Sequence, residues 1–158
     1  MSYRIQVCTF SDAEALANNN VSAFWEDATW RLIWTRPGHA EIPKEDLIRA
    51  AGLRMRNNLI MDRDARRHVK AVDGNGEIVG YARWVFPSEK WNDAWPEMKV
   101  AEPSEEERTL FAEMSESAAE IWVPREDMGP VDEPVSEVLD ELMGKKEYLS
   151  MISVSAKE

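Results

Sequence analysis

A β-hairpin in the middle of the chain is the feature that most restricts its fold. The strand-like run HVKAV, residues 68–72, is separated by the turn-rich loop DGNGE from a second strand-like run, IVGYARWVF, residues 78–86. Val, Ile, Tyr and Trp favour strands, and the two glycines of the loop tolerate the positive φ angles that tight hairpin turns need. The sequence therefore predicts an antiparallel strand pair at this point.

Two more strands are expected, one near each end of the chain. Residues 3–9 alternate in character, so that one side of the strand carries Tyr3, Ile5 and Val7. Residues 147–154, EYLSMISV, place strand-favouring residues between serines, a pattern typical of a strand that is covered on both faces. Almost no chain follows this last strand. We therefore expect the fold to be incomplete, without room for a turn and a returning strand.

Helices are expected between the first strand and the hairpin. One begins at Ser11, whose hydroxyl can form a capping box with Glu14, and a second, short helix is capped by Asp27. A third follows Pro43. Its apolar residues recur at helical spacing and predict an inward-facing stripe of Ile48, Ala51, Met55 and Leu59. Its arginines are expected to face solvent: Arg49, Arg54 and Arg56.

The segment 88–144 is expected to be variable and largely helical. Ser104 and Glu107 form a second capping box, and a shorter helix from Val135 to Met143 is expected to end at Gly144. The element order is then strand, helix, helix, strand, strand, helical segment, strand. This order predicts a single domain over residues 1–158 of the α/β class, with α+β character and a mixed sheet on which the helices pack.

Charge and cysteine content restrict the partners and the compartment. The net charge is −11, and residues 86–158 carry 7 Lys or Arg against 19 Asp or Glu, which argues against nucleic acid or an anionic membrane as a partner. Cys8 is the single cysteine, so no intrachain disulfide can form and a reducing compartment is expected. Neither a signal peptide nor a membrane-spanning run is evident. These features predict a cytoplasmic protein.

Three stretches together resemble a known enzyme family. They are YRIQVCTFSDAEALANNNVSAF, HVKAVDGNGEIVGYARWVF and EYLSMISV, and they contain the expected first strand and helix, the hairpin and the last strand. With these stretches in this order, the chain resembles the N-terminal half of a GNAT-superfamily N-acetyltransferase, in particular the fungal members. The resemblance spans nearly all 158 residues, with 88–144 as an enlarged variable segment. It stops before the loop that holds the acetyl-CoA pyrophosphate.

The resemblance implies transfer of an acetyl group from acetyl-CoA to a small-molecule amine, by direct attack within a ternary complex. In such enzymes the fourth strand offers main-chain groups to the pantetheine arm and the thioester oxygen, and the matching positions are Ile152, Ser153 and Val154. Backbone N–H groups held in a sheet can stabilise a developing oxyanion without reorganising. The family's pyrophosphate motif, Gln/Arg-x-x-Gly-x-Gly/Ala, has no counterpart after this strand, and no residue is assigned as a catalytic acid or base.

Aromatic residues are candidates for the acceptor pocket. Phe24, Trp25 and Trp30 fall in the helical region that shapes this pocket in proteins of the family, and Trp84 lies in the hairpin. They could line a site for an apolar or aromatic amine. Aromatic residues at helical spacing more often fill a core, so packing is the alternative role of the same side chains.

The remaining polar candidates have structural explanations as alternatives. His39 and His68 lack the spacing of a zinc site, and His68 is expected to be a surface or half-buried residue. A basic group could meet CoA phosphates or form a solvated turn; its members are Arg63, Arg66, Arg67 and Lys70. Two functions therefore stay open. One is an acetyltransferase homologue, and the other is a non-catalytic protein that binds a partner, or a second copy, through the exposed edge of its last strand.

Overall fold

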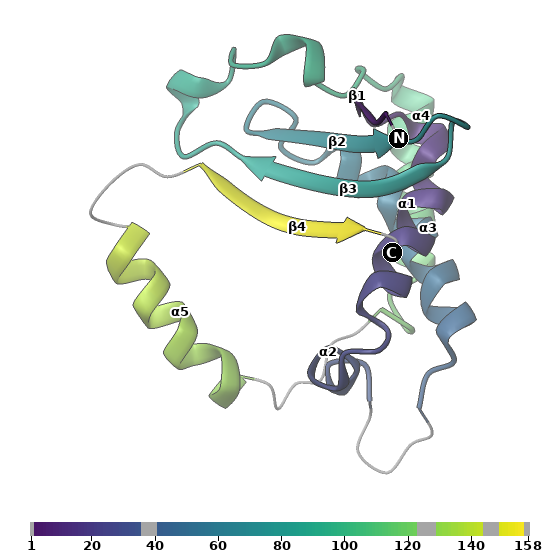
Figure 1. The fold of residues 1–158 in the computed structure, drawn as a ribbon, viewed down its shortest axis with the longest axis vertical. Coiled ribbons are helices and arrows are strands. Elements are labelled where there is room, and N and C mark those ends of the chain that lie inside the picture. The colour runs from purple at the N-terminus through teal and green to yellow at the C-terminus, as the bar shows by residue number, and fades with distance from the viewer. Residues whose placement is uncertain (1, 36–40, 123–128, 144–148, 157–158) are drawn as a thin grey trace.

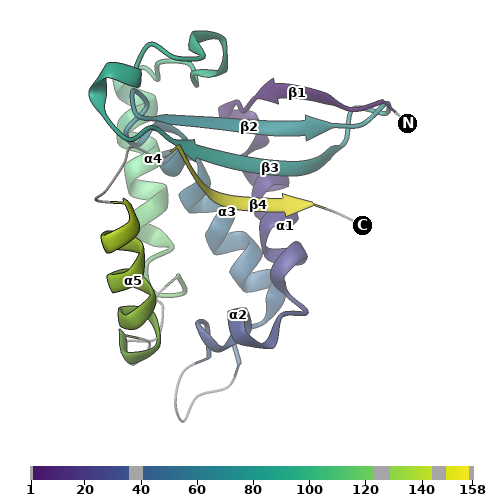
Figure 2. The same ribbon diagram turned by 60° about the vertical axis from the view of Figure 1, so that its left-hand side comes forward.

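The computed structural model describes residues 2–35, 41–122, 129–143 and 149–156. Its strands form one sheet in the order β1-β2-β3-β4, and each neighbouring pair is antiparallel. The strands are β1 (Arg4–Val7), β2 (Arg66–Val72), β3 (Ile78–Val85) and β4 (Ser150–Ala156). Figures 1 and 2 show the sheet with the long helices on one side of it.

Most of the helical content lies in four helices of more than ten residues. They are α1 (Ala13–Phe24), α3 (Lys44–Ile60), α4 (Glu105–Ser117) and α5 (Gly129–Met143). The shorter ones are η1 (Phe10–Asp12), α2 (Ala28–Leu32), η2 (Glu89–Trp91) and η3 (Pro96–Met98). Within the described ranges, no helix combines the length and the apolar character that crossing a membrane requires.

The α+β class is confirmed, but the predicted mixed sheet is purely antiparallel among the described strands. The reason lies in the connection between β1 and β2. The chain leaves β1 along α1 and returns along α3, which packs beside α1 (Figure 1). One helix leads the chain away from the end of β1 and the other leads it back to that same end of the sheet. β2 therefore starts where β1 ends and runs in the opposite direction.

Local sequence signals place most element boundaries correctly. The hairpin β2–β3 is confirmed, and in its loop Gly76 has φ 88° while Asp73 Oδ1 accepts bonds from the amides of Asn75 and Glu77. The capping box of Ser104 and Glu107 opens α4 as expected.

The other predicted helix boundaries can be compared directly. Asp27 accepts bonds from two amides at the start of α2, and α3 begins directly after Pro43. The last helix is longer than expected and starts at Gly129. The expected cap Gly144, like residues 147–148 of the predicted last strand, lies outside the described residues.

The first helix begins differently from the prediction. Thr9, rather than Ser11, precedes the first turn, and its amide donates to Asp12 Oδ2 at 2.7 Å. The same carboxylate oxygen accepts a bond from Lys70 Nζ at 2.6 Å. Lys70 lies on β2, so this ion pair draws the start of the helix onto the sheet, and the Ser11–Glu14 capping box of the prediction is replaced by a Thr9–Asp12 one.

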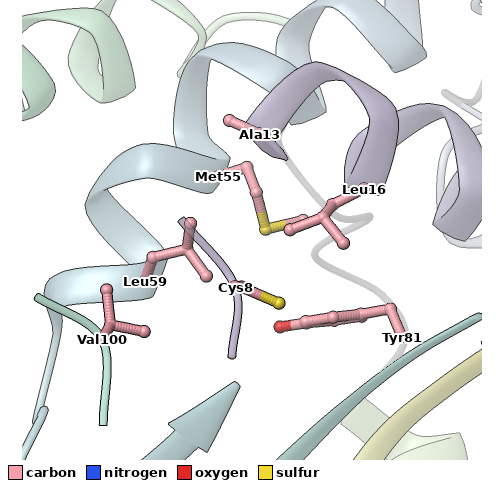
Figure 3. Packing of buried hydrophobic residues seen from close by; sticks show 7 residues of the cluster. All are labelled: Cys8, Ala13, Leu16, Met55, Leu59, Tyr81 and Val100. Carbon is pink, nitrogen blue, oxygen red and sulfur yellow. The ribbon is translucent and has the colours of Figure 1, made fainter. Parts of the chain in front are cut away.

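The core lies between the sheet and the helix pair α1–α3. One buried cluster joins Cys8, Leu16, Leu59 and Tyr81, and Figure 3 shows the Tyr81 hydroxyl directed toward the Cys8 sulfur. A second cluster, at the other end of the helices, contains Ala17, Val21, Trp34, Leu47 and Ala51. The predicted stripe of α3 is confirmed for Ala51, Met55 and Leu59, which are buried. Ile48 is only partly buried.

Arg67 organises the opposite face of the sheet. Its side chain has no exposed surface, and its guanidinium donates to backbone carbonyls on both sides of the hairpin. The acceptors are the carbonyl oxygens of Arg63, Asp64, Arg66, Asn92, Ala94 and Trp95. The ring of Phe86 lies under the guanidinium, 4.9 Å from its carbon. Arg67 therefore fastens the segment that follows β3 to the start of β2.

The predicted solvated basic turn is therefore wrong for Arg67. Its neighbours are also engaged, because Arg63 pairs with Glu102, Arg66 with Asp62 and Lys70 with Asp12. The sequence could not indicate this arrangement, since Asn92, Ala94 and Trp95 reach Arg67 only after β3 has folded back along β2.

Replacing Arg67 by Met should lower the free energy of unfolding by about 3 kcal/mol or more, because several buried carbonyls would lose their donor. Arg66→Met is the matched control. Its surface pair with Asp62 should contribute less than about 1 kcal/mol. Urea denaturation of both variants measures the difference, and equal losses would show that Arg67 is not the fastening residue.

Candidate functional site

A cavity of about 290 Å³ opens between α1, α3 and β3. This volume lies at the lower end of the roughly 300–1,000 Å³ that small-molecule pockets occupy, so the cavity suits a metabolite. From α3 it is lined by Ala51, Arg54, Met55 and Asn58. The other walls are formed by Asn20, Tyr81, Arg83 and Trp122.

The spacing of these residues explains why they share one cavity. Ala51, Arg54, Met55 and Asn58 are three, four and seven residues apart, so they lie on one face of α3. Tyr81 and Arg83 are two residues apart on β3 and so project from the same face of the sheet. The cavity is therefore the place where a face of α3 meets a face of β3.

The cavity borders the strand that was expected to hold the cofactor. On β4, Ser153 pairs with Arg83 and Ser155 pairs with Tyr81, the two β3 residues in the cavity wall. The register then shifts, because Trp84 pairs with Met151. Ile152 is consequently an extra residue in β4, which is the geometry of a β-bulge. For Ile152, Ser153 and Val154 the structure describes the backbone, and it runs beside the cavity wall.

A buried hydrogen bond holds the Tyr81 side of the cavity. His68 Nδ1 lies 2.8 Å from the Tyr81 hydroxyl oxygen, and His68 is 1% exposed, so the prediction of a surface or half-buried histidine is wrong. Burial, and then the charges of Arg83 and Arg66, lower the pKa of His68 to about 3. Burial also raises the pKa of Tyr81. Both side chains are therefore neutral at pH 7, and His68 is a poor proton acceptor.

Cys8 has the structural role expected of a buried cysteine. It is 1% exposed, and burial raises the pKa of its thiol to about 12. A thiol with this pKa stays protonated at neutral pH, so Cys8 does not act as a nucleophile. Within the described ranges, no group of three or more His, Cys, Asp or Glu side chains is placed to hold a metal ion. His39 lies outside those ranges.

Two arginines give the cavity its charge. The guanidinium carbon of Arg54 lies 5.4 Å from the centroid of the Trp122 ring, and burial lowers the pKa of Arg54. The prediction that Arg54 faces solvent holds only in part, because Arg54 lines the cavity and is partly buried. Arg83 Nε is shielded from solvent and has no hydrogen-bond partner among the described residues. No Asp or Glu is among the residues that line the cavity.

Three of the four predicted aromatic residues lie around the α1–α2 turn. Phe24 stacks on Trp30 with ring centroids 5.9 Å apart, and Trp30 and Trp34 lie at 5.6 Å. Trp34 then meets Trp122, at 4.2 Å, in the cavity wall. Trp25 also borders this cluster. This placement fits the packing role that the sequence left open.

Trp84 is separated from the other three predicted residues. It follows Arg83 on β3 and so projects from the opposite face of the sheet, where its ring contacts Trp95 at a centroid distance of 6.0 Å. The cavity residues that sequence reasoning missed are Trp122, the polar residues of α1 and α3, and Tyr81 and Arg83 of β3. For Arg54 and Asn58, the helical spacing to Ala51 and Met55 was the available signal.

Comparisons with known proteins assign no family. A scan against protein-family models found no match, and searches of curated proteins and of solved structures found none either. The resemblance to acetyltransferases accordingly rests on the sequence stretches and stays a prediction.

The low pKa of His68 predicts a loss of stability in acid. The unfolded chain takes up the His68 proton near pH 6.5, whereas the folded protein resists it until about pH 3. Between these values the unfolded state binds more protons than the folded state. The contribution of His68 to the free energy of unfolding is therefore fully present above pH 6.5 and decreases as the pH falls below it. Compared with His68→Asn, the wild type should lose roughly 2 kcal/mol between pH 7 and pH 5.

Denaturation curves of both proteins at the two pH values give this difference. The acid dependence that comes from the carboxylates is the same in both proteins, so it drops out of the difference between them. A parallel acid dependence of wild type and His68→Asn would mean that His68 is not buried as a neutral side chain.

Proposed function

We propose that this protein is GNAT-like and transfers an acetyl group from acetyl-CoA to the amine of a small molecule held in the cavity. The observation that carries the proposal is the bulge at Ile152, which lies in β4 next to the strand that forms the cavity wall. Bulges interrupt the pairing of backbone groups and often occur beside active sites. The resemblance in sequence assigns the acetyl group to this same stretch of β4.

The physical task of β4 is to orient the acetyl group and to stabilise charge. When bound, acetyl-CoA supplies the acetyl group as a thioester. Backbone amides at positions 152–154 are held by the sheet, so they can donate to a developing oxyanion with little reorganisation. The cavity, whose wall includes the β3 residues paired with β4, would then hold the amine close to this position. Proximity of this kind converts a bimolecular reaction into a local one.

Proton removal from the amine falls to water. No carboxylate is among the residues that line the cavity, and His68 is neutral, buried and bonded to Tyr81. An amine would lose a proton as its nitrogen bonds to the acetyl carbon and the C–S bond of the thioester breaks. A solvent molecule in the open cavity can take this proton, and the departing thiolate of CoA would take one up in turn. The chain's own residues therefore contribute orientation and electrostatics rather than a dedicated base.

The described residues fit the acyl and pantetheine part of the cofactor better than its nucleotide. The basic side chains considered for the phosphates are engaged, because Arg66 pairs with Asp62, Arg63 with Glu102 and Lys70 with Asp12. Contacts to β4 would then dominate recognition of acetyl-CoA by this part of the chain.

Acetyl-CoA should protect the β4 amides from hydrogen exchange. Binding to the native state alone must also raise stability, by about 2.7 kcal/mol when the ligand concentration is 100 times the dissociation constant. Exchange measured by mass spectrometry should show slower exchange in residues 151–154, with little change in the β2–β3 loop. Adenosine 3′,5′-bisphosphate is the control, because it lacks the pantetheine and should leave β4 unprotected. If acetyl-CoA in large excess changes neither exchange nor thermal stability, acetyl transfer by this chain is excluded.

A second candidate function is partner binding through β4. In the described sheet β4 is the outermost strand next to β3, and Leu149 and Met151 are 44% and 50% exposed. An unpaired strand edge with exposed apolar residues can add a strand from another molecule. This candidate needs no cofactor, so it is the explanation that remains if acetyl-CoA does not bind.

Edge pairing predicts that the protein self-associates as its concentration rises. Met151→Lys places a charge on the exposed part of β4 and should shift the equilibrium toward monomer, because charged residues block edge pairing. Tyr3→Lys on the chain before β1 is the control for a charge added elsewhere. Sedimentation equilibrium measures the association constant, and a monomer at all concentrations would rule out pairing between copies.

A further inference from the structure

The cavity carries positive charge in an acidic protein. The chain has 30 Asp and Glu against 19 Lys and Arg. The charged side chains that line the cavity are nevertheless both arginines, Arg54 and Arg83. Chance placement would favour carboxylates. Two guanidinium groups at one cavity, without a carboxylate between them, have the composition of a site for an anion.

Arg83 lines the cavity and has one donor that makes no hydrogen bond among the described residues. Its Nε is removed from solvent and has no hydrogen-bond partner among the described residues, while the adjacent His68 and Tyr81 bond to each other. An unsatisfied buried donor costs free energy, about 1–3 kcal/mol for a neutral group and more for a charged one. The guanidinium as a whole is partly buried at the cavity wall, so the charge of an anionic ligand there would offset part of the cost of its burial.

Arg54 is held in place by packing rather than by an ion pair. Its guanidinium lies against the ring of Trp122, and no carboxylate of the described residues lies within salt-bridge distance. A contact with an aromatic ring does not use up the N–H groups of a guanidinium as an ion pair would, so they can donate to a ligand. Edge-on donation by a planar fork matches the two oxygens of a carboxylate.

The rest of the cavity restricts the body of the ligand. Ala51, Met55 and the ring of Trp122 provide apolar walls, and Asn20 and Asn58 add side-chain amides. The volume of about 290 Å³ suits a small molecule. The ligand class is therefore a small molecule with an anionic end and a short aliphatic body.

We propose that the cavity binds the carboxylate of a small aliphatic molecule, with Arg54 and Arg83 as its cationic partners. This inference rests on the proposed function only in one respect. If the chain transfers acetyl groups, the acceptor is an amino-carboxylate, which presents its amine toward the β4 backbone while the arginines hold its carboxylate. Carboxylate binding itself needs no acetyl-CoA and can be measured without it.

Three probes separate the parts of this ligand. Norleucine carries an amine and a carboxylate, hexanoate carries the carboxylate alone, and pentylamine carries the amine alone. Isothermal titration calorimetry at low salt and without acetyl-CoA should detect norleucine and hexanoate, with pentylamine at least tenfold weaker. Inorganic phosphate is a fourth arm. If phosphate binds and both carboxylates do not, the carboxylate assignment is overturned in favour of a phosphate ligand.

Variants test the two arginines. Arg83→Gln and Arg54→Gln should each weaken hexanoate binding at least tenfold. Arg4→Gln removes the same charge from the exposed strand β1 and should leave binding unchanged. Equal binding by all three variants would overturn the inference, and so would failure of both carboxylates to bind to the wild type.

Stability measurements keep the variant test decisive. Arg83 makes no hydrogen bond from Nε, so Arg83→Gln should unfold at the temperature of the wild type or above it. If Arg54→Gln unfolds because its contact with Trp122 is lost, Arg83→Gln alone decides the outcome. Hexanoate binding that depends on Arg83, together with absence of acetyl-CoA binding, would support this inference and reject the proposed function.

Discussion

Two adjacent residues of β2 hold the two faces of the sheet, and the rest of the structure depends on them. Arg67 points to one face and binds the carbonyls of the segment after β3, while His68 points to the other and bonds to Tyr81. Both side chains are polar and buried, so their hydrogen bonds come from within the protein, although His68 Nε2 has no partner among the described residues. The alternation of a strand sends them to opposite sides. One dipeptide thus fixes the loop segment on one face and the cavity wall on the other.

The cavity lies next to the buried pair of His68 and Tyr81. His68 Nδ1 is bonded to the Tyr81 hydroxyl, whereas His68 Nε2 and Arg83 Nε have no hydrogen-bond partner among the described residues. Arg83 and Arg54 line the same cavity, and β4 with its bulge runs beside it. The proposed carboxylate site therefore rests on two cationic side chains at one cavity without a carboxylate among its lining residues.

Sequence reasoning succeeded where the signal was local. Asp27, Pro43 and the Ser104–Glu107 pair mark helix starts because a cap needs only residues within one turn, and the glycine loop marks the hairpin. The α+β class followed from the order of these elements.

Sequence reasoning failed where partners are far apart in the chain. Lys70 reaches Asp12 across 58 residues and thereby moves the start of the first helix. Arg67 and His68 resembled surface residues because their partners come from other strands and loops. The cavity was equally hidden, since Arg54 lies on a helix and Arg83 on a strand, and only the packing of α3 on β3 brings them together. The bulge at Ile152 depends on the register with β3, which no local pattern encodes.

The central claim is that β4 and the cavity form one site, and a bisubstrate compound tests it most directly. Such a compound links the sulfur of CoA through an acetyl bridge to the amine of norleucine. If the two binding positions adjoin, the linked compound should bind at least a hundredfold more tightly than either acetyl-CoA or norleucine alone, because the second contact becomes intramolecular. Titration calorimetry of the wild-type protein gives the three affinities. A compound that binds no more tightly than its better half would contradict the claim.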